Sequence, residues 1–453
     1  QHRATQAEIA VFMECTVTRL LKEGDRIAGA FGYWRESGRF VVFEAPAVIL
    51  ATGGIGKAYK VTSNSWEYTG DGHALALWAG ADLMDMEFVQ FHPTGMVWPP
   101  SVRGILVTEG VRGDGGVLRN AEGERFMFDY IPEYFKAETA DNEPEADRWY
   151  DDKKNNRRPP ELLPRDEVAR AINSEIKAGR GSEHGGIYLD IASRRSPDFI
   201  RKRLPSMYHQ FKELADVDIT AEPMEIGPTC HYVMGGVEVD ADTEQAHVSG
   251  LYAVGECSGG MHGSNRLGGN SLSDLLVFGR RAGEAAAAYV AGLDVRPVVS
   301  EDDVRAGQWS ALAPFNAKGD DNPYTIQQDL QQTMNDLVGI IRTESELQAA
   351  LTAIEGLKQR AATMSIEGHR QYNPGWHLAL DLRNMLLVAE SIAKAALERQ
   401  ESRGGHTRDD YPKPDAEWGT KNLVVTLADD RESVMLNPQP LPPMPDDLQK
   451  FFE

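Results

Sequence analysis

Short apolar runs separated by turn residues dominate the first fifty positions of the chain. Three of them have the length and composition of β-strands: residues 9–13, 27–34 and 40–44. Glu36-Ser37-Gly38 joins the last two as a hairpin. Residues 48–50 form a shorter apolar run, typical of a buried strand, that leads into Ala51-Thr52-Gly53-Gly54. A strand that ends in such small residues lets the backbone approach a ligand closely, although a plain tight turn explains the glycines as well.

Helical patterns begin further along. A helix is expected from Asp71, as its N-cap, to about Ala79. Residues 164–178 place apolar side chains at helical spacing, and a long helix is expected from Ser271-Leu272. After a linker at 297–323, three amphipathic helices are predicted: residues 326–342, 344–362 and 376–400. Thr343 and Glu346 form a capping box for the second of them.

Other stretches lack a helical period. Residues 234–239 and 250–256 return to strand character, and the proline-rich stretch 436–445 is expected to be extended. Residues 133–160 are strongly polar without any period. We interpret this stretch as a solvated surface excursion, and we expect no functional role for it.

Composition narrows the classes of function. The 453 residues are too many for one ordinary core, so two or three domains are expected. The net charge of -22 argues against nucleic acid as a partner, because phosphate contacts need a basic face. The 3 cysteines form no disulfide framework, which suits a reducing compartment. The most apolar helical candidate, 272–290, is interrupted by charges, so membrane attachment is expected to come from other subunits.

Two glycine-rich stretches carry the most chemical information. Residues 228–236 place His231 beside a glycine pair, and residues 264–272 place Arg266 among glycines. Arginine grips a carboxylate by two parallel hydrogen bonds, so the two stretches together suit a small di-acid. Each stretch alone has a plain structural explanation, since His231 could be a core histidine and the glycines could be turns.

Three upstream motifs complete the pattern: Gln90-Phe91-His92-Pro93-Thr94-Gly95, Thr108-Glu109-Gly110-Val111-Arg112, and Leu163-Pro164-Arg165-Asp166-Glu167. With these motifs in this order, the chain resembles the bacterial flavoprotein subunit of succinate dehydrogenase and fumarate reductase, from near its start to about Pro412. The resemblance implies an α/β fold, α+β overall, built around a Rossmann-like FAD-binding domain that is incomplete here.

The implied domains follow the family. They are the middle part of the FAD-binding domain (1–87), an inserted capping and substrate domain (88–228), the last part of the FAD-binding domain (229–296), a helical bundle (297–402), and a small C-terminal domain (403–453). The family begins with a G-x-G-x-x-G phosphate loop and a histidine that carries the flavin covalently, and residues 1–453 contain neither. We therefore expect the chain to be the later part of a longer polypeptide, which alone does not hold FAD stably.

The resemblance also assigns residues. Four would bind the two carboxylates of succinate or fumarate: His92, Thr108, His231 and Arg266. Arg165 would transfer the proton, and Glu109 and Arg112 would relay it to solvent. Eight would contact FAD: Ala51, Thr52, Gly53, Gly54, Asp71, Glu256, Ser271 and Leu272. Arg165 stands at a helix start, which is unfavourable for a cation and invites a functional explanation, although pairing with a nearby carboxylate is a simple alternative.

The implied reaction is oxidation of succinate to fumarate by hydride transfer to FAD. Electrons would pass to an iron–sulfur subunit, because this chain has too few cysteines for a cluster, and then to a quinone. Membrane anchor subunits would hold the complex at the cytoplasmic face of the cell membrane, where this subunit would be peripheral.

Three alternatives remain beside this interpretation. A fumarate reductase would use the same site in reverse. L-aspartate oxidase has similar motifs, but the family pattern associates it with Cys before the glycine pair and Ala-Ser after Asn-Arg-Leu, where this chain has Met234 and Gly268-Gly269. A flavin-free subunit that only mediates assembly is the third, and the presence of His92, His231 and Arg266 argues against it.

Overall fold

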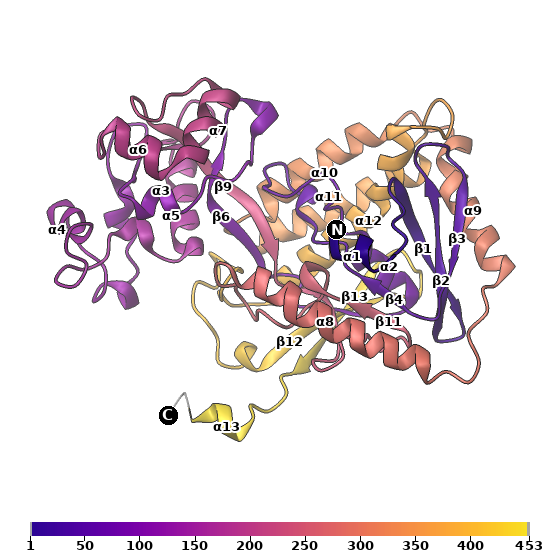
Figure 1. Ribbon diagram of the computed structural model, residues 1–453. Helices are drawn as coiled ribbons and strands as arrows, with labels where there is room; N and C mark the ends of the chain where they lie inside the picture. Colours follow the sequence, from indigo (N-terminus) through magenta and orange to yellow (C-terminus); the bar gives the residue numbers. More distant parts are fainter. Residues whose placement is uncertain (1, 451–453) are drawn as a thin grey trace.

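The computed structural model describes residues 2–450, which fold into two parts joined by a pair of long strands (Figure 1). These strands are β6 (Val89–Met96) and β9 (Met224–Val233), and they pair antiparallel. The smaller part, in magenta tones, lies beyond one end of the pair, and the larger part lies at the other end. Helices and sheets are mixed throughout, which confirms the predicted α/β class.

The smaller part is a sheet flanked by helices. Strands β7 (Val117–Arg119) and β8 (Ile187–Asp190) extend the pair to the order β6-β9-β8-β7. Its helices are α3 (Gly110–Gly113), α4 (Glu143–Trp149), α5 (Arg165–Lys177), α6 (Pro197–Arg203) and α7 (Pro205–Ala215). Val168 and Ile172 of α5 pack with Leu189 and Ile226 of the sheet, so this part has a hydrophobic core of its own.

The larger part contains three further sheets. One is the antiparallel meander β1 (Cys15–Glu23), β2 (Arg26–Trp34) and β3 (Phe40–Glu44). Another is the parallel pair β4 (Val48–Leu50) and β11 (Leu251–Ala253). The last has the order β10-β5-β12-β13, with β5 (Leu83–Met84), β10 (Gly236–Val237), β12 (Lys421–Leu427) and β13 (Val434–Pro440). Strands from both ends of the chain therefore share one sheet.

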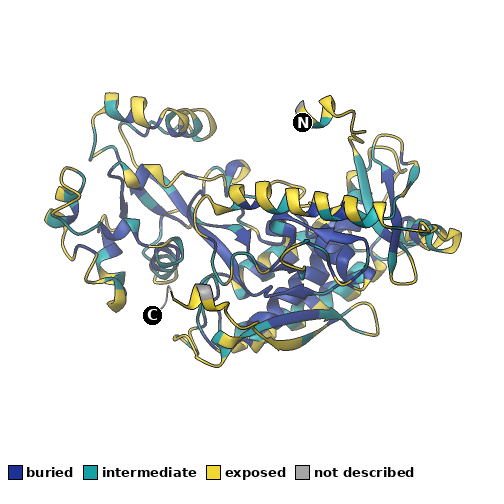
Figure 2. Ribbon diagram, turned by 60° about the horizontal axis from the view of Figure 1, so that its bottom comes forward, coloured by how far each residue is buried: buried dark blue, intermediate teal, exposed yellow. Residues whose placement is uncertain are grey.

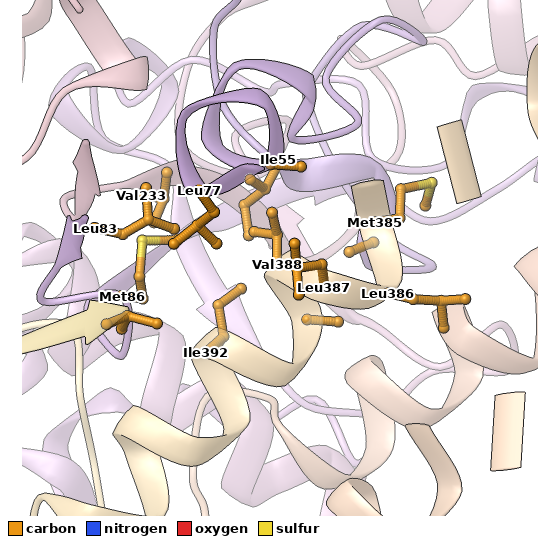
Figure 3. Packing of buried hydrophobic residues seen from close by; sticks show 14 of the residues in the cluster. Ile55, Leu77, Leu83, Met86, Val233, Met385, Leu386, Leu387, Val388 and Ile392 are labelled. Carbon is orange, nitrogen blue, oxygen red and sulfur yellow. The ribbon is translucent and has the colours of Figure 1, made fainter. Parts of the chain in front are cut away.

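Four helices contribute side chains to the main core of the larger part: α2 (Asp71–Ala79), α10 (Pro323–Leu337), α11 (Glu344–Thr363) and α12 (Pro374–Glu398). The other described helices of this part are α1 (His2–Gln6), α8 (Asn270–Ala291), α9 (Glu301–Asn316) and α13 (Asp446–Gln449). Figure 3 shows side chains of α12, Leu387 and Val388 among them, packed toward Leu77 of α2 and Ile55. Buried positions fill the interior of both parts, whereas outer helices carry exposed ones (Figure 2).

Most of the predicted elements are confirmed, with shifted ends. Strands β2, β3 and β4 and helices α5, α11 and α12 occupy their expected ranges, and α8 begins beside Ser271-Leu272. Helix α10 begins and ends earlier than predicted, at Pro323 and Leu337. Thr343 caps α11 as expected, since its Oγ1 accepts from the Glu346 N–H at 3.3 Å.

Three local predictions are wrong. Residues 9–13 form no strand; Ile9 and Met13 are exposed, and the meander begins only at Cys15, where pairing with Trp34 starts. The expected linker 297–323 contains helix α9, which Ser300 caps; its internal Pro314 hides the helical signal in the sequence. The polar excursion 133–160 contains α4, held at its start by Asn142. In the last two cases local capping outweighs an unfavourable composition.

Asp71 is also one position away from its predicted role. Gly70, with a φ of +80°, is the N-cap of α2, and Asp71 is the first helical residue. Only a residue that tolerates left-handed backbone fits the cap position here, which explains why glycine stands there.

Candidate active site

Two histidines meet where β6 and β9 pair. His92 lies opposite Thr229 in the ladder, two positions from His231, and the centroids of the two imidazole rings are 5.3 Å apart. Nδ1 of His92 lies 3.2 Å from both the N–H and the carbonyl oxygen of Thr94; with the N–H as the donor, the ring proton is on Nε2. Nδ1 of His231 is 2.8 Å from Oγ of Ser63. Both rings are held through Nδ1, which leaves each Nε2 available to a ligand.

Both imidazoles are neutral near pH 7. Burial, followed by Arg266 and Arg165, lowers the pKa of His231 to about 4. Burial also lowers the pKa of His92 well below its usual value, with Arg165 as the next cause. The histidines therefore act as hydrogen-bond donors rather than as cations, and the positive charge of the site comes from arginines.

Arg266 is locked between β6 and the start of α8. Its Nη2 donates to Oε1 of Gln90 at 2.9 Å and its Nη1 to Oγ of Ser271 at 3.2 Å. The guanidinium lies over the ring of Tyr232, 4.5 Å from the centroid, and Nε is buried without a hydrogen-bond partner among residues 2–450. The Nε2 amide of Gln90 donates back to the Arg266 carbonyl at 2.8 Å. Arg266 is thus a pre-oriented cation with one unused donor.

Arg165, Glu109 and Arg112 form a chain of contacts. Nε of Arg165, the first residue of α5, donates to Oε2 of Glu109 at 3.1 Å. Nη2 of Arg112 lies 3.7 Å from the same oxygen. The Glu109 side chain is 48% exposed, whereas the side chain of Arg112 is 1% exposed. Glu109, and not Arg112, is therefore the member of this chain that reaches solvent.

The buried position of Arg112 changes its acidity. Burial is the main cause that lowers the pKa of Arg112 to about 10; Glu109 opposes the shift and Arg165 adds to it. Burial and Arg165 likewise lower the pKa of Arg266. Crowding of like charges in a dry site makes these guanidiniums easier to deprotonate than free ones.

The two halves of the site face each other across Gly268. A Cβ added at Gly268 would lie 3.3 Å from Nη2 of Arg165, so the arginine passes close to the loop that carries Arg266. Nδ2 of Asn265 in that loop lies 3.4 Å from Oδ1 of Asp166, which follows Arg165 on α5. Thr108 lies beside this group because it directly precedes Glu109 in the chain. Its Oγ1 accepts from the Gly110 N–H.

The predicted FAD contacts gather at the end of β4 and the start of α8. Gly53 has a φ of +73°, and a Cβ added at Gly54 would lie 2.1 Å from Oε1 of Glu256. That oxygen accepts from the Val233 N–H at 3.1 Å, and burial raises the pKa of Glu256 to about 7. The glycine pair thus leaves room for the carboxyl group and keeps bare backbone at the strand end.

The remaining contacts fit a flavin nucleotide. Ala51, Thr52 and Leu272 are exposed. Gly269, the N-cap of α8, provides no side-chain cap, and the N–H groups of Asn270 and Leu272 bond to the carbonyls of Leu267 and Gly269. Asp71 differs, because Nδ2 of Asn384 donates to its Oδ1 and burial raises its pKa. The backbone glycines and the exposed apolar surface are compatible with the predicted contacts to FAD.

Sequence reasoning missed several supporting residues: Ser63, Gln90, Thr94 and Tyr232. Gln90 begins the motif that contains His92, and because it lies two positions before His92 it is on the same face of β6. That spacing could have indicated it. Ser63 comes from a loop distant in sequence from His231, and no local pattern predicts that pairing.

Comparison with known proteins identifies the family and the cofactor of this chain. The family model described as FAD binding domain matches residues 1–272, and the one described as Fumarate reductase flavoprotein C-term matches residues 327–445. The first match confirms FAD as the cofactor. No helix within residues 2–450 is long and apolar enough to cross a membrane.

Among similar sequences, a fumarate reductase (CoM/CoB) chain of Methanothermobacter marburgensis is 42% identical over 92% of this chain and 70% of its own length. The succinate dehydrogenase flavoprotein subunit of Coxiella burnetii is 36% identical over 86% of this chain and 64% of its own. The chain thus spans about two thirds of such relatives.

Solved structures agree with these matches. Mycobacterium smegmatis Sdh1, in complex with UQ1, is 59% identical with a TM-score of 0.86, covering 100% of this chain and 72% of that one. An Escherichia coli quinol fumarate reductase chain is 33% identical with a TM-score of 0.83, over 95% of this chain and 72% of that one. The chain belongs to the family of FAD-binding flavoprotein subunits of succinate dehydrogenase and fumarate reductase.

Proposed function

We propose that this chain is the flavoprotein subunit of a succinate dehydrogenase that oxidises succinate to fumarate. The observation that carries the proposal is the convergence of Arg165, Arg266 and Arg112 on one site, where Glu109 is the only carboxylate bonded to them among residues 2–450. Two neutral imidazoles add donors without adding charge. An excess of buried positive charge suits a dianion.

The residues divide the work as follows. Nε2 of His92 and His231, the Thr108 hydroxyl and the free Nε of Arg266 bind the carboxylates and align the two methylene carbons. When bound, FAD supplies the hydride acceptor. Arg165 first gives a proton to Glu109 and, as a neutral guanidine, takes the proton from the other carbon; Glu109, whose side chain is exposed, releases its proton to water.

The proposed function includes partner subunits. Electrons would leave through an iron–sulfur subunit to a quinone, and anchor subunits would hold the complex at the cytoplasmic face of the membrane. The M. smegmatis protein was solved with UQ1, and this supports a quinone-linked complex for the present chain.

The second candidate is fumarate reduction, since the same residues serve both directions. It is favoured by the fumarate reductase relatives, of which the M. marburgensis chain is 42% identical. L-aspartate oxidation is less suited to this site. The substrate ammonium would have to lie among guanidiniums, and Glu109, the carboxylate bonded to Arg165, is already occupied.

Arg165→Gln in the purified holoenzyme tests the proposal. Turnover with succinate should fall by at least about 10²- to 10⁴-fold, the usual contribution of a general acid or base. Malonate, a non-reacting dicarboxylate, should still bind. Arg201→Gln, a change on α6 outside the site, is the control. Near-normal turnover of Arg165→Gln would remove Arg165 from the mechanism, whereas a holoenzyme of the unchanged protein that does not oxidise succinate would refute the proposed function.

A further inference from the structure

Behind Arg112 lies a second buried charge cluster that the reaction does not use directly. Arg125 binds both oxygens of the Glu161 carboxylate, from Nε to Oε1 at 2.6 Å and from Nη2 to Oε2 at 3.0 Å. The side chains of both residues are 0% exposed. Nη1 of Arg125 binds Oδ1 of Asp147 at 3.0 Å, and Arg194 binds the same oxygen.

Glu161 contacts Arg112 through its backbone only. Nη1 of Arg112 donates to the Glu161 carbonyl, while the carboxylate of the same residue is turned to Arg125. Nε and Nη2 of Arg112 are buried without hydrogen-bond partners among the described residues. The buried guanidinium of Arg112 thus has two unused donors, and the carboxylate of the neighbouring Glu161 accepts from neither of them.

We infer that Arg125 is a positioning residue for the proton relay, because its two bonds to Glu161 keep that carboxylate away from Arg112. The inference rests on the proposed function, in which Arg112 acts together with Glu109. With Glu161 sequestered, Nη2 of Arg112 has Glu109, at 3.7 Å, as its acidic neighbour. If the Glu161 carboxylate were free, it would bind the unused donors and draw Arg112 away from Glu109.

The electrostatic surroundings of Arg112 agree with this arrangement. The groups that act on it are Glu109 on its own turn, Arg165 from α5, Glu161 from the turn Pro160–Leu162, and Tyr150 from the end of α4. The pKa of Arg112 is lowered chiefly by burial, Glu161 already opposes that shift from its place beside Arg125, and a Glu161 carboxylate bonded to Arg112 would raise the pKa further. A more basic Arg112 would hold its proton and slow proton exchange with Glu109.

The polar segment 133–160 gains a role from this cluster. Its Asp147 secures Arg125, and the Tyr150 hydroxyl donates to the Arg112 carbonyl at 2.9 Å. The segment therefore fixes Arg112 in two ways. Tyr150 holds the backbone of Arg112 directly, and Asp147 holds Arg125, which keeps the Glu161 carboxylate away from Arg112. This differs from the sequence-based expectation of a surface excursion without function.

The test compares Arg125→Met, the double variant Arg125→Met/Glu161→Gln, and the control Arg157→Met in the holoenzyme. Arg157 makes a matching two-bond pair with Glu145, at 2.8 Å and 2.7 Å, in the same segment but away from the relay. We expect Arg125→Met to lower kcat by about tenfold or more, part of the usual contribution of acid–base catalysis. The acid–base limb of its pH profile should move, while malonate affinity stays the same.

Removing the charge of Glu161 separates the inference from a structural role. The double variant should recover most of the lost kcat, because the freed side chain no longer carries a charge that competes for Arg112. If Arg125→Met does not fold, an active double variant still supports the inference. A double variant as slow as Arg125→Met, or an Arg125→Met enzyme with normal kcat and pH profile, overturns it. The proposed function is tested separately, by succinate turnover of the unchanged holoenzyme, which does not depend on Arg125 or Glu161 being replaced.

Discussion

The carboxylate clamp is Arg266 together with Gln90 and Ser271, the residues that hold its guanidinium. Replacing Arg266 by alanine tests this clamp most directly. In the structure its guanidinium is held by Gln90 and Ser271 and lies over Tyr232, with Nε free of partners among the described residues. The residue is 6% exposed, so a carboxylate bound there has little competition from water. Alanine removes the charge and leaves Oε1 of Gln90 without its donor.

The magnitude follows from the loss of a buried, charge-assisted contact. Truncating one partner of such a pair costs about 2–5 kcal/mol. Since about 1.4 kcal/mol corresponds to a tenfold change in affinity, malonate binding should weaken by roughly 30- to 5000-fold. Because Arg266 holds substrate in both the ground and the transition state, KM should rise and kcat/KM should fall by at least as much.

The assay is titration of the holoenzyme with malonate, followed by succinate kinetics. Arg280→Ala is the matched control, because Arg280 lies on α8, which begins just after Arg266, is 78% exposed and pairs with Glu284. It should bind malonate as the unchanged protein does. If Arg266→Ala binds malonate within about twofold of the unchanged protein, Arg266 is no substrate ligand and the clamp is wrongly placed.

Two further predictions concern stability and the loop that supports the clamp. Both ring nitrogens of His73 are buried without partners among the described residues and burial lowers its pKa to about 4, so His73→Leu should raise the free energy of unfolding by about 1–3 kcal/mol at pH 7. This gain in the free energy of unfolding should grow as pH falls from about 6.5 toward 4, because in that range only the unfolded state of the original protein binds the proton. Urea unfolding at pH 7 and pH 5 measures the gain and its pH dependence, and an equal gain at the two pH values contradicts the prediction. Gly404 has a φ of +53° and an added Cβ would lie 2.3 Å from the Ser264 carbonyl oxygen, so Gly404→Ala should displace the Arg266 loop and weaken malonate binding. Gly279→Ala, where the Cβ meets open space, should not, and equal affinities for the two variants would contradict this argument.

Local patterns predicted the elements that depend on local physics. Helix α11 was placed almost correctly because its cap, Thr343, and its apolar spacing both act within a few residues. The meander strands β2 and β3 were recognised by their composition and the turn between them. Helix α9 was missed because its internal Pro314 contradicts the helical pattern, while its packing against the meander compensates.

Long-range pairing lay beyond any local pattern. β12 joins β5, with Val425 opposite Leu83, so a strand near the chain end completes a sheet begun early in the chain. For the same reason, the sequence predicted the candidate site residues one motif at a time and not the contacts between them. His92 and Arg266 could be singled out by their motifs, but the bond from Gln90 to Arg266 and the sequestering of Glu161 by Arg125 depend on the folded arrangement.

The use of an arginine as a proton carrier is easier to understand from the whole cluster than from Arg165 alone. An isolated guanidinium keeps its proton at any physiological pH. Here three guanidiniums surround one site, and the pKa values of Arg112 and Arg266 are both lowered by burial and by Arg165. Each proton that moves from Arg165 to Glu109 relieves that repulsion and enters a carboxyl group at the protein surface. In the proposed mechanism, the cations that bind the dicarboxylate therefore also favour movement of the proton outward, and for this reason a carboxylate-binding site and a proton relay can share the same small volume.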